Sequence, residues 1–244
     1  MDTPIIPVLE TDRFSFKCTS CVPCFNDCCR DLNQYLTPYD ILRIKTHLNL
    51  ASGEFLAQFT RSHTGQESGL PVITLKTDPA SGFQCPFVRP EGCLVYENRP
   101  TSCRLYPLAR AFSRSRETGQ RTEQYFLIKE SHCLGFESGS GWTVQQWLED
   151  QTVRPYNEMN DMMMDIIHLK NIFRPGPLDL KSAHLFHLAC YDLDAFRVHV
   201  FEKGILGDET PATNLLERAR WNESELLKLG LNWIKKILFG NAAL

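Results

Sequence analysis

The sequence CTSCVPCFNDCC fills residues 18–29 and places five cysteines within twelve positions. Two adjacent thiols such as Cys28 and Cys29 seldom share one apolar environment, because successive side chains leave the backbone in different directions. Cysteines at this density therefore indicate metal ligands or disulfides rather than core packing. The choice between these two interpretations decides what the rest of the chain implies.

The bulk composition favours metal ligands. The chain has 244 residues, of which 43% are hydrophobic, so it can build a core without covalent cross-links. The N-terminal stretch MDTPIIPVLETDRFSF lacks a basic region followed by an apolar segment of signal-peptide length. We therefore expect a cytoplasmic protein, and the cytoplasm keeps thiols reduced. The disulfide interpretation stays open, because the compartment is itself inferred.

The charge balance argues against two classes of partner. The chain carries 26 Lys and Arg against 29 Asp and Glu, which gives a formal net charge of −3. This balance offers no basic surface that would attract nucleic acid or an anionic membrane. No run reaches the roughly 18 apolar residues that are needed to span a bilayer. Metal ions are the partners that the sequence predicts, and it leaves the identity of any protein partner unknown.

More cysteines follow in three later segments. Cys85 and Cys93 bound the stretch CPFVRPEGC, Cys103 lies in RPTSCRLYP, and Cys133 lies in HCLGF. Pro86 in the first of these segments favours a turn, and turns expose backbone N–H groups that can bond to thiolates and tune a bound metal. These segments can therefore supply further ligands.

Arginines flank one of these cysteines. Arg99 and Arg104 lie on either side of Cys103. Their positive charge would lower the pKa of a nearby thiol or offset a negatively charged metal site. The alternative is that both are ordinary surface residues.

The spacing of the first cysteines partly matches a ferredoxin. Cys18, Cys21, Cys24 and Cys28 follow the bacterial C-x2-C-x2-C-x3-C run. Cys29 stands where that run has a proline, and a second run is missing. A simple ferredoxin is therefore not expected.

Three longer patterns resemble a known family. They are CFNDCCRDLNQYLTPYDILRIKTHL, CPFVRPEGCLVYENRPTSCRLYPLAR and HCLGF. The chain resembles the YkgJ-type cysteine-cluster proteins, the CxxCxxCC family, described as a zinc- or iron-chelating domain. The resemblance covers roughly residues 14–136, and the helical remainder is similar to the longer members. It implies eight ligands: Cys18, Cys24, Cys28, Cys29, Cys85, Cys93, Cys103 and Cys133. The chain departs from the compact CxxCxxCC spacing because residues 25–27 separate Cys24 from Cys28, and Cys21 is left as a spare thiol.

Eight thiolates are twice what one tetrahedral zinc or one four-iron cluster takes. The set therefore implies two metal centres, or one polynuclear centre with some structural sulfurs. All-sulfur ligation favours zinc or an iron–sulfur cluster over calcium or magnesium. The density of sulfur favours iron by a small margin.

The rest of the chain predicts an α+β fold that is predominantly helical, with a small antiparallel sheet and cysteine-rich metal-binding loops. Thr37 and Pro38 begin a helix, and Ser52 begins a second. Strands are expected at 71–76, 105–112 and 124–129, together forming one small sheet. Helices are expected at 143–173, where Thr143 caps, and at 178–190, 195–203 and 211–239. We expect a cysteine-cluster domain at 14–136 and a helical region at 142–244, packed as one unit.

The last of these helices carries an apolar stripe. Leu227, Leu231, Ile234 and Leu238 recur at helical spacing and are expected to face the core, with a partner-binding face as the alternative.

Histidines give weaker signals for ligation. His184, His187 and Cys190 recur every three residues on one predicted helix, which indicates either a soft-ligand face or a partly buried helix side. His132 adjoins Cys133, so it either donates a hydrogen bond to the site or lies at the surface.

Two other functions remain open besides a metal-binding protein that stores, delivers or senses its metal. One is a metal-cluster-dependent enzyme, since the family resembles the cysteine-cluster part of flagellin lysine-N-methylases. The sequence has no catalytic constellation and no nucleotide-binding motif that would support an enzyme. The other is a disulfide-stabilised interaction module.

Overall fold

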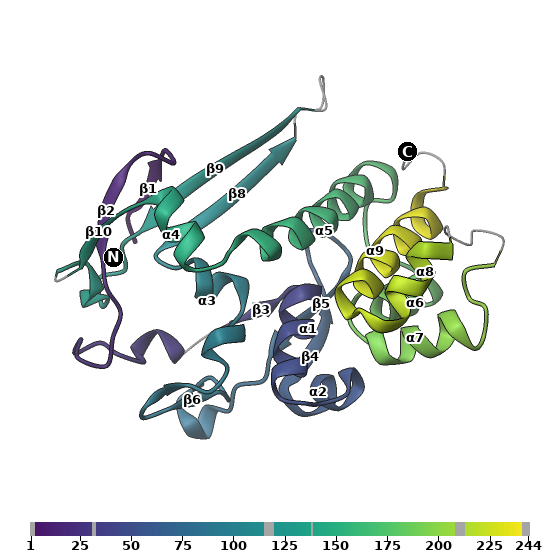
Figure 1. Ribbon diagram of the computed structural model, residues 1–244, viewed down its shortest axis with the longest axis horizontal. Helices are drawn as coiled ribbons and strands as arrows, with labels where there is room; N and C mark the ends of the chain where they lie inside the picture. The colour runs from purple at the N-terminus through teal and green to yellow at the C-terminus, as the bar shows by residue number, and fades with distance from the viewer. Residues whose placement is uncertain (1–2, 31–32, 115–119, 138, 208–212, 241–244) are drawn as a thin grey trace. The chain divides into compact units, whose positions relative to one another are not determined.

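The computed structural model describes residues 3–30, 33–114, 120–137, 139–207 and 213–240 (Figure 1). The chain divides into two compact units. The first, here called the cysteine unit, consists of Met1–Leu32 and Thr77–Pro155. The second, here called the helical unit, consists of Asn33–Lys76 and Tyr156–Leu244. Each unit is therefore assembled from two separate segments of the chain.

Helices and small antiparallel sheets make up both units, which confirms the predicted α+β class. The described residues of the cysteine unit form three sheets. The largest has the strand order β1 (Ile5–Val8), β9 (Arg121–Ile128) and β8 (Leu108–Arg114). The other two pair β2 (Arg13–Phe16) with β10 (Ser140–Thr143) and β6 (Val88–Arg89) with β7 (Gly92–Cys93). The helical unit holds the sheet of β3 (Tyr35–Leu36), β5 (Pro71–Leu75) and β4 (Thr60–Thr64).

The single predicted sheet is wrong. The strand at 71–75 pairs with β3 and β4 in the helical unit, whereas β8 and β9 pair with each other in the cysteine unit. The strand expected at 105–112 begins later, at Leu108, because Leu105 ends the short helix α3 (Thr101–Leu105). Strand propensity located these segments but carried no information about their partners.

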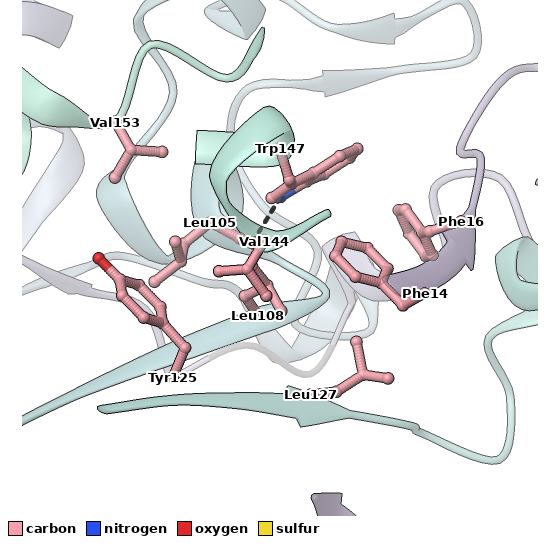
Figure 2. Close-up of a cluster of buried hydrophobic side chains, with 9 residues drawn as sticks. All are labelled: Phe14, Phe16, Leu105, Leu108, Tyr125, Leu127, Val144, Trp147 and Val153. Atoms are coloured by element: carbon pink, nitrogen blue, oxygen red, sulfur yellow. Dashed lines mark hydrogen bonds between the residues drawn. The ribbon is translucent and has the colours of Figure 1, made fainter. Parts of the chain in front are cut away.

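An apolar core lies between the strands and the helix α4 (Val144–Asp150) of the cysteine unit (Figure 2). Phe14 and Phe16 alternate with exposed neighbours along β2, so both rings point to the same side of the strand. The Trp147 indole N–H donates to the carbonyl oxygen of Leu105 at 3.0 Å, the dashed line in Figure 2. The full cluster is Phe14, Phe16, Leu105, Leu108, Tyr125, Leu127, Val144, Trp147 and Val153.

The helix predicted at 143–173 is two helices. Thr143 caps α4 as expected, since its hydroxyl accepts from the Gln146 amide and the Gln146 side chain accepts in return. The helix then ends at Asp150, and Thr152 adopts a φ of 51°. The helix α5 (Arg154–Phe173) starts anew beyond this turn. A left-handed residue breaks the helical hydrogen-bond series, and threonine gives no sequence signal for it.

The helical unit contains most of the helices. They are α1 (Pro38–His47), α2 (Ser52–Phe59), α6 (Leu180–Cys190), α7 (Leu193–Phe201), α8 (Thr213–Trp221) and α9 (Glu223–Phe239), with all but the first two residues of α5. The predicted start of α1 is confirmed, because the Thr37 hydroxyl accepts from the Asp40 amide and the Asp40 carboxylate accepts from the Thr37 amide. The helices at 178–190 and 195–203 are confirmed as α6 and α7, with starts two residues from those expected.

The helix predicted at 211–239 is also two helices. Asn222 ends α8 and caps α9, because its side-chain oxygen accepts from the amides of Ser224 and Glu225. The predicted start at Pro211 lies outside the described residues. The apolar stripe of α9 is buried as expected, with Leu227, Leu231, Ile234 and Leu238 all at most 5% exposed.

Close contacts and buried charge hold the helices of this unit together. Gly230 of α9 lies so near α6 that an added Cβ would approach the carbonyl oxygen of Ala189 to 2.3 Å. Lys45 of α1 is 4% exposed and pairs with Asp194 at 3.4 Å and with Glu223. Asp194 also accepts from the Ser52 amide and hydroxyl. Lys45 therefore ties α1 to the starts of α7 and α9.

Candidate metal centre

The first cysteine segment leaves β2 and runs through consecutive tight turns. Backbone N–H groups of Val22, Phe25, Asp27 and Cys29 each donate to the carbonyl oxygen three residues earlier. The run ends in a short 3-10 turn, η1 (Asp27–Cys29), which Asn26 enters with a φ of 71°. Such turns bury little backbone and expose side chains, so one short loop can present several sulfurs.

The second segment forms a small hairpin beside the first. β6 and β7 pair Val88 with Cys93, and Gly92 supplies the φ of 131° that the turn needs. The Cys85 amide donates to the Cys29 carbonyl oxygen at 2.8 Å. The Asn26 side chain donates to the Arg89 carbonyl oxygen at 2.9 Å. Two hydrogen bonds therefore join two loops that are well separated in the sequence.

The segment around Cys133 also contacts the first cysteine segment. The Lys17 amide donates to the Gly135 carbonyl oxygen at 2.9 Å, and the Leu134 amide donates to the Cys24 sulfur at 3.2 Å. An added Cβ on Gly135 would come within 2.7 Å of the Phe16 ring, so this approach requires glycine. An N–H donated to a thiolate stabilises its negative charge, as expected beside a metal ligand.

All ten cysteines are free thiols, and they differ in exposure. Of the eight predicted ligands, Cys18, Cys28 and Cys103 are exposed, and the other five are partly buried. All eight lie in the cysteine unit. The spare thiol Cys21 is exposed, and Cys190 is buried in the helical unit.

The thiols lie close enough to affect one another's ionisation. A hydrogen bond from the Cys29 thiol lowers the pKa of Cys28 to about 7, against the opposing effect of burial. The same bond raises the pKa of Cys29, and burial and the thiolates of Cys28, Cys85 and Cys103 raise it further. One thiol of the adjacent pair is therefore poised to ionise, and the other to retain its proton.

Burial and neighbouring thiolates both raise the pKa of other cysteines in the predicted ligand set. Burial raises the pKa of Cys18 to about 11, and thiolates at Cys28, Cys133 and Cys24 add to this effect. Burial likewise raises the pKa of Cys133, and the neighbouring Tyr106 side chain acts in the opposite direction. Crowded thiolates repel one another, and a bound cation would remove that repulsion.

The donor set fits a soft metal, although the sulfurs are not preassembled around a point. Cysteine thiolates bind zinc and the irons of iron–sulfur clusters, and eight of them occur together here. Among the residues that the structure describes, no group of three or more His, Cys, Asp or Glu side chains is arranged to hold a metal ion. The thiols are thus neighbours on hydrogen-bonded loops and are not gathered around a single point.

The two arginines beside Cys103 are not ordinary surface residues. Arg99 and Arg104 are 8% and 5% exposed. Arg99 stacks on the Tyr96 ring at 3.9 Å and donates to the Gln151 side chain. Arg104 donates to the carbonyl oxygens of Gln151 and Glu97. Both arginines therefore fasten the segment around Cys103 to the turn after α4.

The charge of Arg99 also reaches the thiols. Burial raises the pKa of Cys93, and the positive charge of Arg99 acts in the opposite direction. Arg99 therefore favours the ionised form of a nearby thiol, as predicted, in addition to fastening the segment around Cys103.

The histidine signals are weaker than the cysteine ones. Cys190 is fully buried on α6, and burial raises its pKa. Burial lowers the pKa of His187, one turn earlier. The His132 side chain is 49% exposed and lies 3.7 Å from the Glu130 carboxylate. These arrangements favour a buried helix side for α6 and a surface position for His132.

Aromatic residues around the cysteine loops were missed in the sequence. Phe16 packs edge-on against Tyr106, Phe136 and Trp147, with ring centroids 5.7, 5.1 and 5.5 Å apart. Phe16 lies two residues before Cys18, and Tyr106 and Phe136 each lie three residues after a predicted ligand. This short, repeated spacing from a predicted ligand was the sequence signal that could have identified these aromatic residues.

A comparison with known protein families gives a match for part of the chain. No curated protein and no solved structure matches the chain. No helix in the described part of the chain combines the length and apolar character that crossing a membrane requires. Residues 17–134, which include all eight predicted ligands, match the CxxCxxCC family, described as "Putative zinc- or iron-chelating domain". This segment of the chain is therefore similar to the CxxCxxCC family.

Proposed function

We propose that the chain is a cytoplasmic metal-binding protein that holds zinc or an iron–sulfur centre through Cys18, Cys24, Cys28, Cys29, Cys85, Cys93, Cys103 and Cys133. The observation that carries this proposal is the set of hydrogen bonds joining the three cysteine segments, above all that from the Leu134 amide to the Cys24 sulfur. The metal-binding domain would extend over residues 14–136, and iron is slightly preferred to zinc.

The proposal assigns the metal a role in folding. The loops carry few regular elements, and several of their cysteines are exposed. Burial is the main cause of the raised pKa of Cys18, and repulsion from neighbouring thiolates adds to it, so bringing thiolates together without a cation costs free energy. Binding a metal would supply the free energy that closes these loops. The aromatic core below them would remain folded in either state.

Metal analysis of anaerobically purified protein tests the proposal. The expected result is stoichiometric zinc or iron, and an absorption spectrum separates the two, because iron–sulfur centres absorb visible light and zinc does not. Cys85→Ala should reduce the metal content, whereas Cys21→Ala should leave it unchanged. Protein that contains neither metal, with all its thiols reduced, would exclude the proposal.

Metal removal provides a second measurement. Chelation should increase hydrogen exchange in residues 18–29, 85–103 and 133–135, because these loops would lose the cation that closes them. Exchange in α9, which belongs to the helical unit, should stay unchanged. Equal exchange with and without metal at the cysteine loops would contradict the folding role.

A further inference from the structure

The connection between α5 and α6 exposes several large apolar side chains. Ile172 and Phe173 in the last turn of α5 are 50% and 52% exposed, and Leu180 at the start of α6 is 91% exposed. The two prolines between these helices are exposed as well. Single exposed apolar residues are ordinary, but several within one short segment indicate an interaction site. Residues 172–180, here called the apolar loop, belong to the helical unit.

A buried lysine holds the apolar loop in place. Lys170 is fully shielded from solvent, and its ammonium group donates to the carbonyl oxygens of Arg174 and Gly176. Burying an ammonium group costs free energy unless hydrogen bonds replace its water. Both of these bonds go to the backbone of the loop, so the buried charge favours one conformation of that backbone.

Further contacts fix the end of the loop. The Asp179 carboxylate accepts from the Ser182 amide at 2.9 Å, which caps α6, and pairs with Arg174 at 3.1 Å. The Leu178 amide donates to the Gly69 carbonyl oxygen at 3.2 Å. An added Cβ on Gly69 would come within 2.1 Å of the loop backbone, so the loop lies directly against the turn before β5. A surface that is already ordered loses little conformational entropy when it binds.

The charges on the loop indicate what binds there. Arg174 is its one cation and Asp179 its one anion, so residues 172–180 carry no net charge. Both side chains are partly exposed, by 38% and 56%. A partner of one sign would gain little from such a surface. A second copy related by a twofold axis would place apolar side chains against apolar side chains and let each cation face the other copy's anion.

We infer that the apolar loop is a contact surface between two copies of this chain, with Ile172, Phe173 and Leu180 as its anchors. The loop lies outside residues 17–134, which match the chelating domain, so the inference goes beyond the proposed function and does not depend on a bound metal. Standard interfaces use about 20–30 residues a side. A loop of this length therefore predicts a weak dimer whose population depends on protein concentration.

Sedimentation velocity of the full-length protein tests the inference. A reductant is present, so that exposed cysteines cannot cross-link two chains. As its concentration rises, wild type should shift from the mass of one chain towards twice that mass. Leu180→Glu should weaken the dimer by about thirtyfold or more, as the loss of a central anchor residue does.

A matched variant controls for the introduced charge. Leu215 of α8 is a 45% exposed leucine in the same unit, and Leu215→Glu should associate like wild type. Leu180→Glu should stay folded, because position 180 is exposed and a carboxylate is favourable in the first turn of a helix. Circular dichroism checks that both variants keep the wild-type helix content.

Arg174→Glu tests the charge argument separately. It leaves the backbone oxygen that Lys170 contacts in place and makes both charges of the loop negative. Two copies of this variant should repel each other, so the dimer should weaken, and more so at low salt than at high salt. An Arg174→Glu dimer as stable as wild type would overturn the twofold pairing of charges.

Other outcomes would overturn the inference as a whole. One is wild type that stays monomeric up to its solubility limit. Another is a dimer that Leu180→Glu and Leu215→Glu weaken equally, because the contact would then lie elsewhere. A third is monomeric wild type that binds phosphatidylglycerol vesicles and loses this binding in Leu180→Glu, because a membrane surface would then occupy the loop. None of these results bears on metal content, so the proposed function is tested independently.

Discussion

Replacing Phe16 with alanine should weaken the part of the molecule that supports the cysteine loops. Phe16 is 2% exposed and contacts three aromatic rings from separate segments, Tyr106, Phe136 and Trp147. The Trp147 ring is held by its hydrogen bond to the Leu105 carbonyl oxygen, so it cannot easily move into the space left by Phe16. A buried Phe→Ala change costs about 3–5 kcal/mol through lost burial and the remaining cavity.

Hydrogen exchange measures this loss within the cysteine unit. The Lys17 amide, bonded to Gly135, reports on the contact next to Phe16. Each 1.4 kcal/mol is tenfold in an equilibrium, so about 3–5 kcal/mol predicts exchange faster by roughly a hundred- to a few-thousand-fold. Metal affinity should fall as well, because more binding energy would go into ordering the loops.

A control substitution in the cysteine unit distinguishes the effect of losing a buried side chain from the effect of shortening any large apolar one. Leu9 is 70% exposed, so Leu9→Ala should alter stability by no more than about 0.5 kcal/mol. If Phe16→Ala increased exchange no more than Leu9→Ala, the reasoning that places Phe16 at the centre of the loop support would be refuted.

Three further changes probe other contacts. Gln151→Met removes the side-chain acceptor of the buried Arg99 guanidinium and should cost about 1–3 kcal/mol in urea unfolding. Asp194 has a lowered pKa, because hydrogen bonds from Ser52 and the charge of Lys45 outweigh its partial burial. Its stabilisation is therefore present above the unfolded pKa of about 3.9 and lost as pH falls through the lower folded value, so Asp194→Asn should reduce the loss of stability on acidification. Gly230→Ala should destabilise the helical unit, since the new Cβ would meet a backbone oxygen at 2.3 Å, and its melting temperature should fall.

Controls and contrary outcomes differ for each change. Gln145→Met alters an exposed glutamine of α4 and should stay within about 0.5 kcal/mol of wild type, so an equal effect at Gln151 would argue against the arginine contact. An unchanged acid response in Asp194→Asn would show that this carboxylate is not linked to folding. Gly82→Ser is the control for backbone strain without crowding. Gly82 has a φ of 67°, and no atom lies within 4 Å of the Cβ that the substitution would add. An unchanged melting temperature in Gly230→Ala would contradict the close approach of α6 and α9.

Features set by neighbouring residues were predictable, and breaks within long apolar patterns were not. The Thr37 and Thr143 caps depend on groups three residues away, so the sequence contains all of their partners. The break at Thr152 and the restart at Asn222 interrupt patterns that continue on both sides. Apolar residues recur at helical spacing on both sides of each break, which is why each pair of helices was predicted as one.

The sequence by itself determined which donor groups this protein carries, because the number, type and spacing of the cysteines belong to the chain whatever its fold. It also carries the resemblance of residues 17–134 to the CxxCxxCC family. The tertiary structure decided which cysteines are neighbours. The contact from Leu134 to Cys24 joins positions 110 residues apart, and Phe16 meets its aromatic partners across similar separations. Such contacts depend on hydrogen bonds and packing between distant segments, and local propensity carries no information about them.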